Sequence, residues 1–139
     1  MTIKFVRLLV FLALFAGLAV TTFGQEDPLQ GAWFDDDRFL KMTLYNGRDK
    51  VVIRGRPQSK GNYTVVGNEV TWKSTHIHSN AFDGMTSRYG WFSREEMYAE
   101  FGSRFNSWFE PVTQTFFING DILTLVSDLS EQQFTRMQK

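Results

Sequence analysis

Gly31-Ala32-Trp33 and Phe134-Thr135-Arg136 lie near opposite ends of a 139-residue chain that is rich in short alternating segments. A single helix-like segment interrupts the strand-like segments between them. The first and last strands of such a series meet when the sheet closes on itself. The two stretches therefore predict a closed β-barrel in which the first strand pairs with the last.

Turns typical of hairpins join the strand-like segments. Residues 38–45 are followed by Asn46-Gly47, which readily supplies the positive φ angles of a tight turn, and residues 50–54 supply the antiparallel partner. Seven or eight such strands with local connections predict an all-β, up-and-down, eight-stranded antiparallel barrel. The other expected strands are residues 30–34, 61–66, 69–78, 112–118, 121–126 and 132–136.

One helix is expected in the middle of the chain. Ser93 and Glu96 have the spacing of a capping box, and Phe92 and Met97 that of a hydrophobic staple, so the helix should begin at Arg94. The apolar residues that follow recur at three- and four-residue spacing and form one stripe. We expect this stripe to cover one end of the barrel; its members are Met97, Phe101, Phe105 and Trp108.

The N-terminus has the pattern of a signal peptide. Lys4 and Arg7 precede a run of apolar residues, 8–20, that is shorter than the ~20 residues of a spanning helix. Cleavage is expected after Gly24, with Ala19 as an earlier alternative, and an uncleaved membrane anchor is the competing interpretation. The prediction is a signal peptide at residues 1–24, one domain at residues 25–139 and a secreted or periplasmic product.

The composition narrows the choice of partners. The chain contains no cysteine, so it has neither a disulfide nor a lipid-attachment cysteine. Removing Lys4 and Arg7 from the 15 basic residues leaves 13 against 15 acidic residues, a net charge of about −2. We therefore predict no nucleic-acid partner and no stable membrane insertion after cleavage, whereas a protein partner is left open.

These features resemble the lipocalin-like branch of the calycin superfamily, in particular its short exported bacterial members. In that family a Gly-x-Trp motif opens the first strand, and an arginine from the last strand stacks over the tryptophan. Gly31 and Trp33 match the first motif, and Arg136 fits the second by position. The resemblance implies that these three residues close the barrel floor, with a cation–π contact between guanidinium and indole.

The chain has two histidines, His76 and His78, on the strand expected at residues 69–78. Strict alternation would point both to the same side as Trp72, into the barrel or its mouth. Two imidazoles offer half of a metal site, with Asp83 as the best candidate for a third ligand. Because zinc sites use three or four protein ligands, we predict no metal and assign both histidines to a ligand site.

The aromatic residues predict either a cavity or a plugged barrel. An eight-stranded barrel is filled by its own side chains or holds one small ligand. The predicted walls of a ligand cavity, besides the two histidines, are Trp72, Tyr89, Trp91, Met97, Phe101 and Phe105.

Catalysis has little support in the sequence, because it lacks a nucleophile motif, a glycine-rich phosphate loop and a metal motif. We predict a non-enzymatic protein without a cofactor that binds a small hydrophobic or amphipathic molecule in the barrel. The first alternative is a protein-interaction or inhibitor scaffold with a filled barrel and an exposed patch around Trp91 and Phe92, or Trp108 and Phe109. The second alternative is a metal-binding or enzymatic barrel that uses the two histidines.

Overall fold

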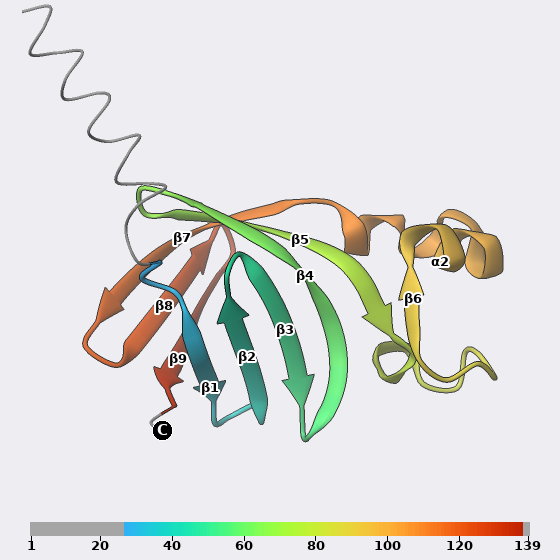
Figure 1. Ribbon diagram of the computed structural model, residues 1–139, viewed down its shortest axis with the longest axis horizontal. Helices are drawn as coiled ribbons and strands as arrows, with labels where there is room; N and C mark the ends of the chain where they lie inside the picture. The colour runs from blue at the N-terminus through green and yellow to red at the C-terminus, as the bar shows by residue number, and fades with distance from the viewer. Residues whose placement is uncertain (1–26, 138–139) are drawn as a thin grey trace, which may run out of the picture.

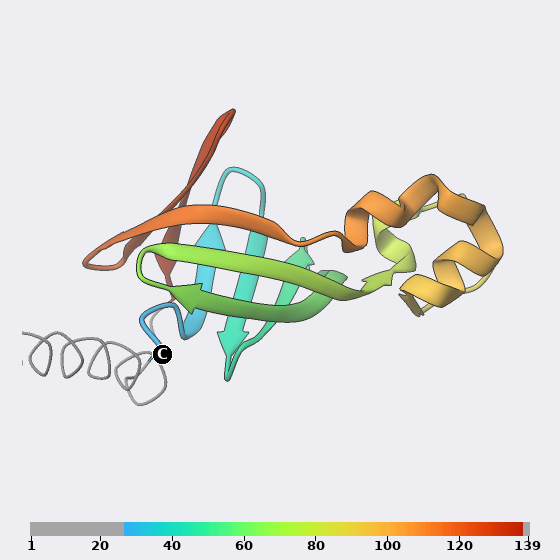
Figure 2. The same cartoon turned by 90° about the horizontal axis from the view of Figure 1, so that it is seen from above.

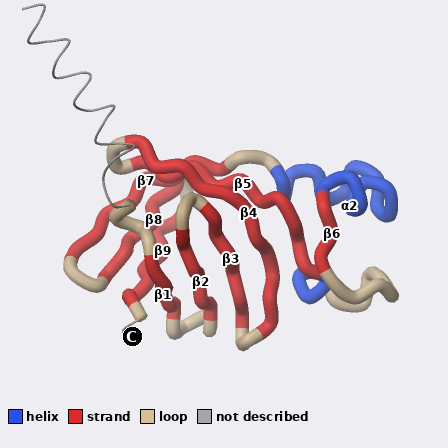
Figure 3. The backbone as a smooth tube through the Cα atoms, in the orientation of Figure 1, coloured by secondary structure: helices blue, strands red, loops and turns tan. Residues whose placement is uncertain are grey.

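The computed structural model describes residues 27–137 (Figure 1), so the predicted signal peptide lies outside the described residues. Most of the described chain is β-structure, drawn red in Figure 3. The strands are β1 (Gly31–Asp35), β2 (Leu40–Tyr45), β3 (Arg48–Ile53), β4 (Arg56–Val66), β5 (Glu69–His78), β6 (Trp91–Ser93), β7 (Val112–Asn119), β8 (Ile122–Ser127) and β9 (Ser130–Arg136).

Eight of these strands form a closed antiparallel barrel. The order around the ring is β4-β3-β2-β1-β9-β8-β7-β5, and β5 pairs with β4 to complete it. The first strand pairs with the last, Trp33 opposite Arg136 and Phe34 opposite Thr135. The predicted up-and-down barrel is confirmed, and the architecture is consistent with a lipocalin-like fold.

Strand β5 is shared between the barrel and a projecting lobe, which we define as residues 76–110. Residues Glu69–Trp72 of β5 pair with β7 in the barrel wall, whereas His76–His78 pair with the short strand β6. The lobe also contains the 3-10 helix η1 (Ser79–Phe82), the helix α2 (Arg94–Phe101) and the 3-10 helix η2 (Gly102–Phe109). Figure 2 shows this helical part beside the barrel, beyond the end of β5.

Helix α2 begins where the sequence predicts. Ser93 accepts a hydrogen bond from the Glu96 backbone N–H, and the Glu96 carboxylate accepts one from the Ser93 backbone N–H, which completes the capping box. The α-helix ends at Phe101 because Gly102 has a φ of +65°. The rest of the predicted stripe therefore lies on η2, whose tighter winding turns Trp108 outward so that 40% of its surface is exposed.

Two separate hydrophobic clusters stabilise the chain. The stripe of α2 and η2 packs in the lobe cluster rather than on the barrel interior, because the helices adjoin β5 and β6 instead of crossing the ring. The barrel cluster contains Leu29, Trp33, Met42, Leu44, Tyr63, Val70, Phe116, Leu123, Leu125 and Phe134. The lobe cluster contains Ile77, Phe82, Phe92, Met97, Phe105 and Phe109.

A β-bulge lies between the part of β5 that pairs with β7 and the part that pairs with β6, and β4 pairs with both parts. Gly61 lies opposite Ser74 and Lys60 lies opposite His76, so Thr75 is an extra residue in β5. The two backbones approach closely here: a Cβ atom on Gly61 would lie 2.1 Å from the Lys73 carbonyl oxygen. The absence of a side chain at Gly61 is therefore a packing requirement of the bulge.

We expect Gly61→Ala to destabilise the protein by about 3 kcal/mol, because the methyl group would force the β4 and β5 backbones apart. Gly61 is the one described glycine without a positive φ, and at such a position alanine ordinarily stabilises a protein relative to glycine. A loss of stability in Gly61→Ala would therefore report the close approach of the two backbones. Urea unfolding followed by circular dichroism measures the change. Thr64→Ala on the exposed side of β4 is the control, and a neutral or stabilising Gly61→Ala would contradict the close approach.

Candidate functional site

One end of the barrel is closed by Trp33 and Arg136, in the arrangement that the resemblance implies. The Arg136 guanidinium lies 4.2 Å from the centroid of the buried Trp33 ring. It also donates hydrogen bonds to the carbonyl oxygens of Gln30 and Pro28, at 3.0 and 3.4 Å. Gly31 fits beneath it with a φ of +134°, where a Cβ atom would come within 3.0 Å of Arg136 Nη1. We call this the closed end.

The opposite end, where the β1–β2, β3–β4 and β8–β9 turns lie, is less tightly filled. The side chains at this end lie on the same face of the sheet as the buried residues of the barrel cluster, two positions along the strand or directly across from them. They therefore point into the barrel. They are nevertheless only half-buried, and we call this the open end. Its half-buried inward-facing residues include Leu40, Val51, Ile53, Ser59, Trp72, Ser74, Gln114 and Gln132, and Asp35 is a buried polar residue at the same end.

Trp72 is the predicted ligand residue that belongs to the open end. Its indole Nε1 donates a 2.8 Å hydrogen bond to Gln114 Oε1 on β7, and its ring lies 5.7 Å from that of Tyr63. Gln132 donates to the Asp35 carboxylate at 3.2 Å on the other side of the interior. The open end thus combines apolar surface with amide and hydroxyl groups, as an amphipathic ligand requires.

The expectation that His76 and His78 share the face of Trp72 is wrong. The extra residue Thr75 shifts the alternation by one, so that Ile77 pairs with the inward-facing Ser59. His76 instead lies opposite the outward-facing Lys60. Because a one-residue shift moves every following side chain to the other side of the sheet, both histidines leave the interior.

His78 forms an aromatic group with Tyr89 and Trp91 on the outward side of the lobe. Its ring is 4% exposed and lies 4.9 Å from each of the two rings, in edge-on geometry. Its Nδ1 accepts a hydrogen bond from the Asn80 backbone N–H. Burial, followed by the charges of Arg56 and other nearby cations, lowers the pKa of His78 and keeps the imidazole neutral.

The remaining predicted wall residues do not line one cavity with Trp72. Met97 and Phe105 are buried in the lobe cluster, and Phe101 packs against it. Of the two patches predicted for an interaction scaffold, Phe92 and Phe109 are buried lobe-core residues, so only Trp91 and Trp108 remain accessible. The predicted set is therefore divided among the barrel, the lobe cluster and the His78 group.

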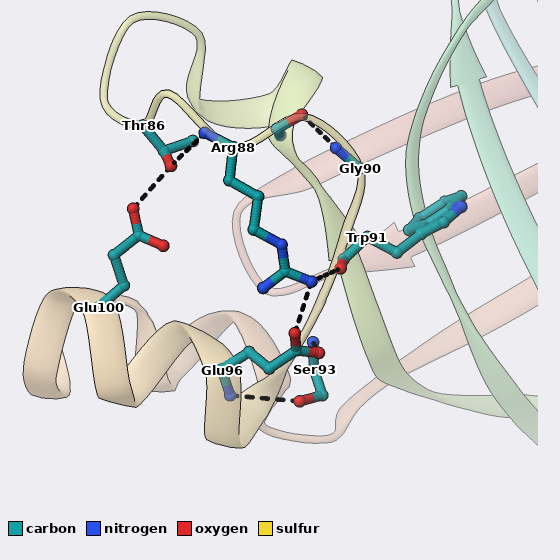
Figure 4. Close-up of polar contacts among 8 residues, drawn as sticks. Thr86, Arg88, Gly90, Trp91, Ser93, Glu96 and Glu100 are labelled. Atoms are coloured by element: carbon teal, nitrogen blue, oxygen red, sulfur yellow. Dashed lines mark hydrogen bonds and ion pairs between the residues drawn. The ribbon is translucent and has the colours of Figure 1, made fainter.

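Polar contacts hold residues 86–90, the segment before β6, against α2 (Figure 4). Arg88 binds the Glu96 carboxylate at 2.6 Å and the Trp91 carbonyl oxygen at 3.3 Å, and its guanidinium lies over the Phe92 ring. Thr86 donates to Glu100 at 2.6 Å. In Figure 4 the Trp91 side chain points away from α2, and its ring lies 4.5 Å from the Lys60 ammonium on β4.

Asp83, the suggested third metal ligand, pairs with Arg56 at 3.1 Å. His76 Nδ1 lies 3.0 Å from the Thr75 hydroxyl. Within residues 27–137, no group of three or more His, Cys, Asp or Glu side chains is close enough to hold a metal ion. The metal-binding alternative thus gains no ligand set from the described part of the chain.

Asp49 is an inward-facing residue that the sequence analysis missed. It lies opposite the buried Leu44, and its Oδ1 is buried with no hydrogen-bond partner among the described residues. Burial raises the pKa of the carboxyl from 3.8 to about 6, against the opposing effect of a hydrogen bond from its own backbone N–H. Nearby, the Tyr63 hydroxyl donates to the Asp27 carboxylate. The alternation of Asp49 with Val51 could have revealed its inward direction.

A shallow hollow of about 300 Å³ lies at the closed end and is lined by Asp27, Pro28, Gln30 and Arg136. Apart from Arg136, which closes the barrel, it contains none of the predicted site residues. Its lining is mostly polar, and the Arg136 guanidinium is already bonded to two carbonyl oxygens there. The hollow therefore does not correspond to the predicted ligand cavity.

No protein-family model, curated protein or solved structure matches this chain. Within residues 27–137 there is no helix long and apolar enough to cross a membrane.

Asp49→Asn should stabilise the protein at neutral pH. Because the folded state binds the Asp49 proton more tightly than the unfolded chain does, the stabilisation from this group is complete below pH 3.8 and is lost as the pH rises through about 6. After allowance for partial exposure, we expect the variant to gain about 1–2 kcal/mol at about pH 7 and nothing at about pH 4. Urea unfolding at both pH values measures the difference.

His78 also makes stability depend on pH, in the opposite direction: because its pKa is lowered in the folded state, its contribution to stability is lost as the pH falls. This contribution is the same in the wild type and in Asp49→Asn. The difference between wild type and Asp49→Asn therefore isolates Asp49. Asp128→Asn, in the exposed β8–β9 turn, is the control and should change stability at neither pH. A gain of equal size at both pH values would contradict the burial of an ionised Asp49.

Proposed function

We propose that this chain is an exported, lipocalin-like binding protein that holds a small amphipathic molecule at the open end of its barrel. The observation that carries the proposal is the contrast between the two ends. Trp33, Leu29 and Arg136 fill and close one end, whereas the inward-facing side chains of the other remain half-buried. A container with one sealed end and one accessible end is suited to reversible binding.

The chemistry of the open end supports an amphipathic ligand. Leu40, Val51 and Trp72 supply apolar surface that packs against the barrel cluster. Gln114 and Gln132 supply amide groups, which bond to Trp72 and Asp35 and carry further donors and acceptors for a ligand. An alkyl or ring portion would contact the first group of residues, and a polar head the second.

The proposed site includes Trp72 but excludes the other aromatic wall residues predicted from the sequence. Met97, Phe101 and Phe105 stabilise the lobe instead. The proposed chemistry is binding alone. Export rests on the signal-peptide pattern of residues 1–24.

Val51→Phe should weaken binding of dansyl-undecanoic acid, an amphipathic fluorescent probe, by about tenfold, because the larger ring occupies the space that the probe needs. Energy transfer from tryptophan to the dansyl group reports binding. Val52→Phe is the matched control, since its side chain points outward on the same strand, and we expect probe affinity within about twofold of wild type.

Thermal unfolding of both variants must precede the comparison, because an overpacked barrel that is partly unfolded would lose affinity without any change at the binding site. Equal effects of Val51→Phe and Val52→Phe in folded proteins would contradict an open-end site. Trp72→Phe provides a second variant that keeps an aromatic ring but removes the donor to Gln114.

Native mass spectrometry of the protein, purified from its natural host without denaturation, tests the carrier function directly. We expect an additional small organic mass that disappears from a denatured sample. The mass would also identify the ligand. A bare chain in both samples would argue against the carrier function.

A filled-barrel interaction scaffold is the second candidate, and one observation favours it. Tyr89 is 77% exposed beside the half-buried Trp91, on the outward side of the lobe. Exposed aromatic rings on a well-held loop are common at protein interfaces. A bare chain in the native spectrum, together with a partner lost from the double variant Tyr89→Ala, Trp91→Ala, would support the scaffold.

A further inference from the structure

The outer surface of strands β2 to β5 is strongly basic, although the chain as a whole carries no excess of positive charge. Each cation is next in sequence to an inward-facing residue of the same strand, so its own side chain points outward. Glu69, at the edge near the β4–β5 turn, is the one acidic residue on this surface among the described residues. The cations of this basic face are Lys41, Arg48, Lys50, Lys60 and Lys73.

Two cations of the basic face are directly opposed across neighbouring strands. Lys50 on β3 lies opposite Lys60 on β4. Like charges in directly opposite positions destabilise a sheet, so this arrangement does not serve the stability of the barrel. Neighbouring strand backbones lie about 5 Å apart, so the flexible side chains of cations on adjacent strands can reach one anionic ligand together.

The five cations of the basic face make no salt bridge with the described residues. By contrast, the salt bridges of the described chain involve Arg38, Arg56, Arg88 and Arg94. The Lys60 ammonium lies 4.5 Å from the centroid of the Trp91 ring, where it contacts an aromatic face rather than a carboxylate. The basic face thus keeps its positive charges available to an external anion.

We propose that the basic face binds a linear acidic polysaccharide, a polymer that carries carboxylate or sulfate groups at regular intervals. This surface is separate from the open end, because it lies on the outside of the same barrel wall. A barrel wall is convex, so a flexible chain follows it and reaches all five cations, whereas a planar membrane would touch only its crest.

The side chains of the basic face favour a polysaccharide over a nucleic acid. Single-stranded nucleic-acid sites interleave cations with aromatic platforms for the bases. Here the residues between the cations are Thr43, Val52, Asn62 and Thr71. The aromatic rings of Tyr45 and Trp91 lie at the edges of the face, Trp91 against Lys60, so that no ring stands between neighbouring cations of strands β2 to β5. Four of the five cations are lysines, whose compact charges do not demand the bidentate geometry that arginine offers to phosphate.

Affinity electrophoresis of the protein through gels containing polygalacturonate, with neutral dextran as the reference, tests the proposal. We expect retardation by polygalacturonate that falls steeply as salt is added. Lys50→Gln, Lys60→Gln should weaken binding about tenfold at low salt, since it removes the opposed pair from the centre of the face. The matched control is Arg94→Gln, Arg104→Gln, which removes the same charge from the lobe and should stay within about twofold of wild type.

Several outcomes would overturn the proposal. Equal losses in the two double variants would mean that only net charge matters, and no retardation of the folded wild type would mean that the surface has no polyanion partner. Tighter binding to single-stranded DNA, or to vesicles containing phosphatidylglycerol, would replace the polysaccharide with another partner. The probe assay at the open end distinguishes this proposal from the carrier function, because Lys50→Gln, Lys60→Gln should leave probe binding unchanged.

Discussion

The close approach of β4 and β5 at Gly61 is the constraint on which the rest of the structure depends. A backbone carbonyl occupies the position of a side chain there, so β5 can bulge. Strand β4 pairs with β5 on both sides of the bulge, whereas the other edge of β5 pairs with β7 before the bulge and with β6 after it. The close approach at Gly61 therefore marks where β5 passes from the barrel to the lobe and which way the two histidines point.

Stability and binding are assigned to different parts of the molecule. The barrel and the lobe each have their own apolar cluster, which burial of aromatic and aliphatic side chains holds together. The open end and the basic face instead contain half-buried amides, hydroxyls and unpaired lysines, which contribute little to folding. Asp49 belongs to neither group, since its buried carboxyl oxygen has no partner among the described residues and weakens the fold at neutral pH.

The two proposed binding surfaces are the two sides of one barrel wall. Along β3, Val51 points to the open end while Lys50 belongs to the basic face, and β4 repeats this with Ser59 and Lys60. Alternation of side chains thus lets a few strands carry an internal site for a small molecule and an external surface for a polymer.

The sequence by itself determined the local features: the hairpin turns, the start of α2 at Arg94 with its capping box, and the pairing of the first and last strands around Trp33 and Arg136. Each of these follows from residues close in sequence or from a motif with a single geometry. Only the tertiary structure decided the direction of His76 and His78 and the separate lobe cluster. The physical reason is that one extra residue at Thr75 reverses all later side chains of β5, and a bulge depends on a contact between strands that alternation along one strand does not encode.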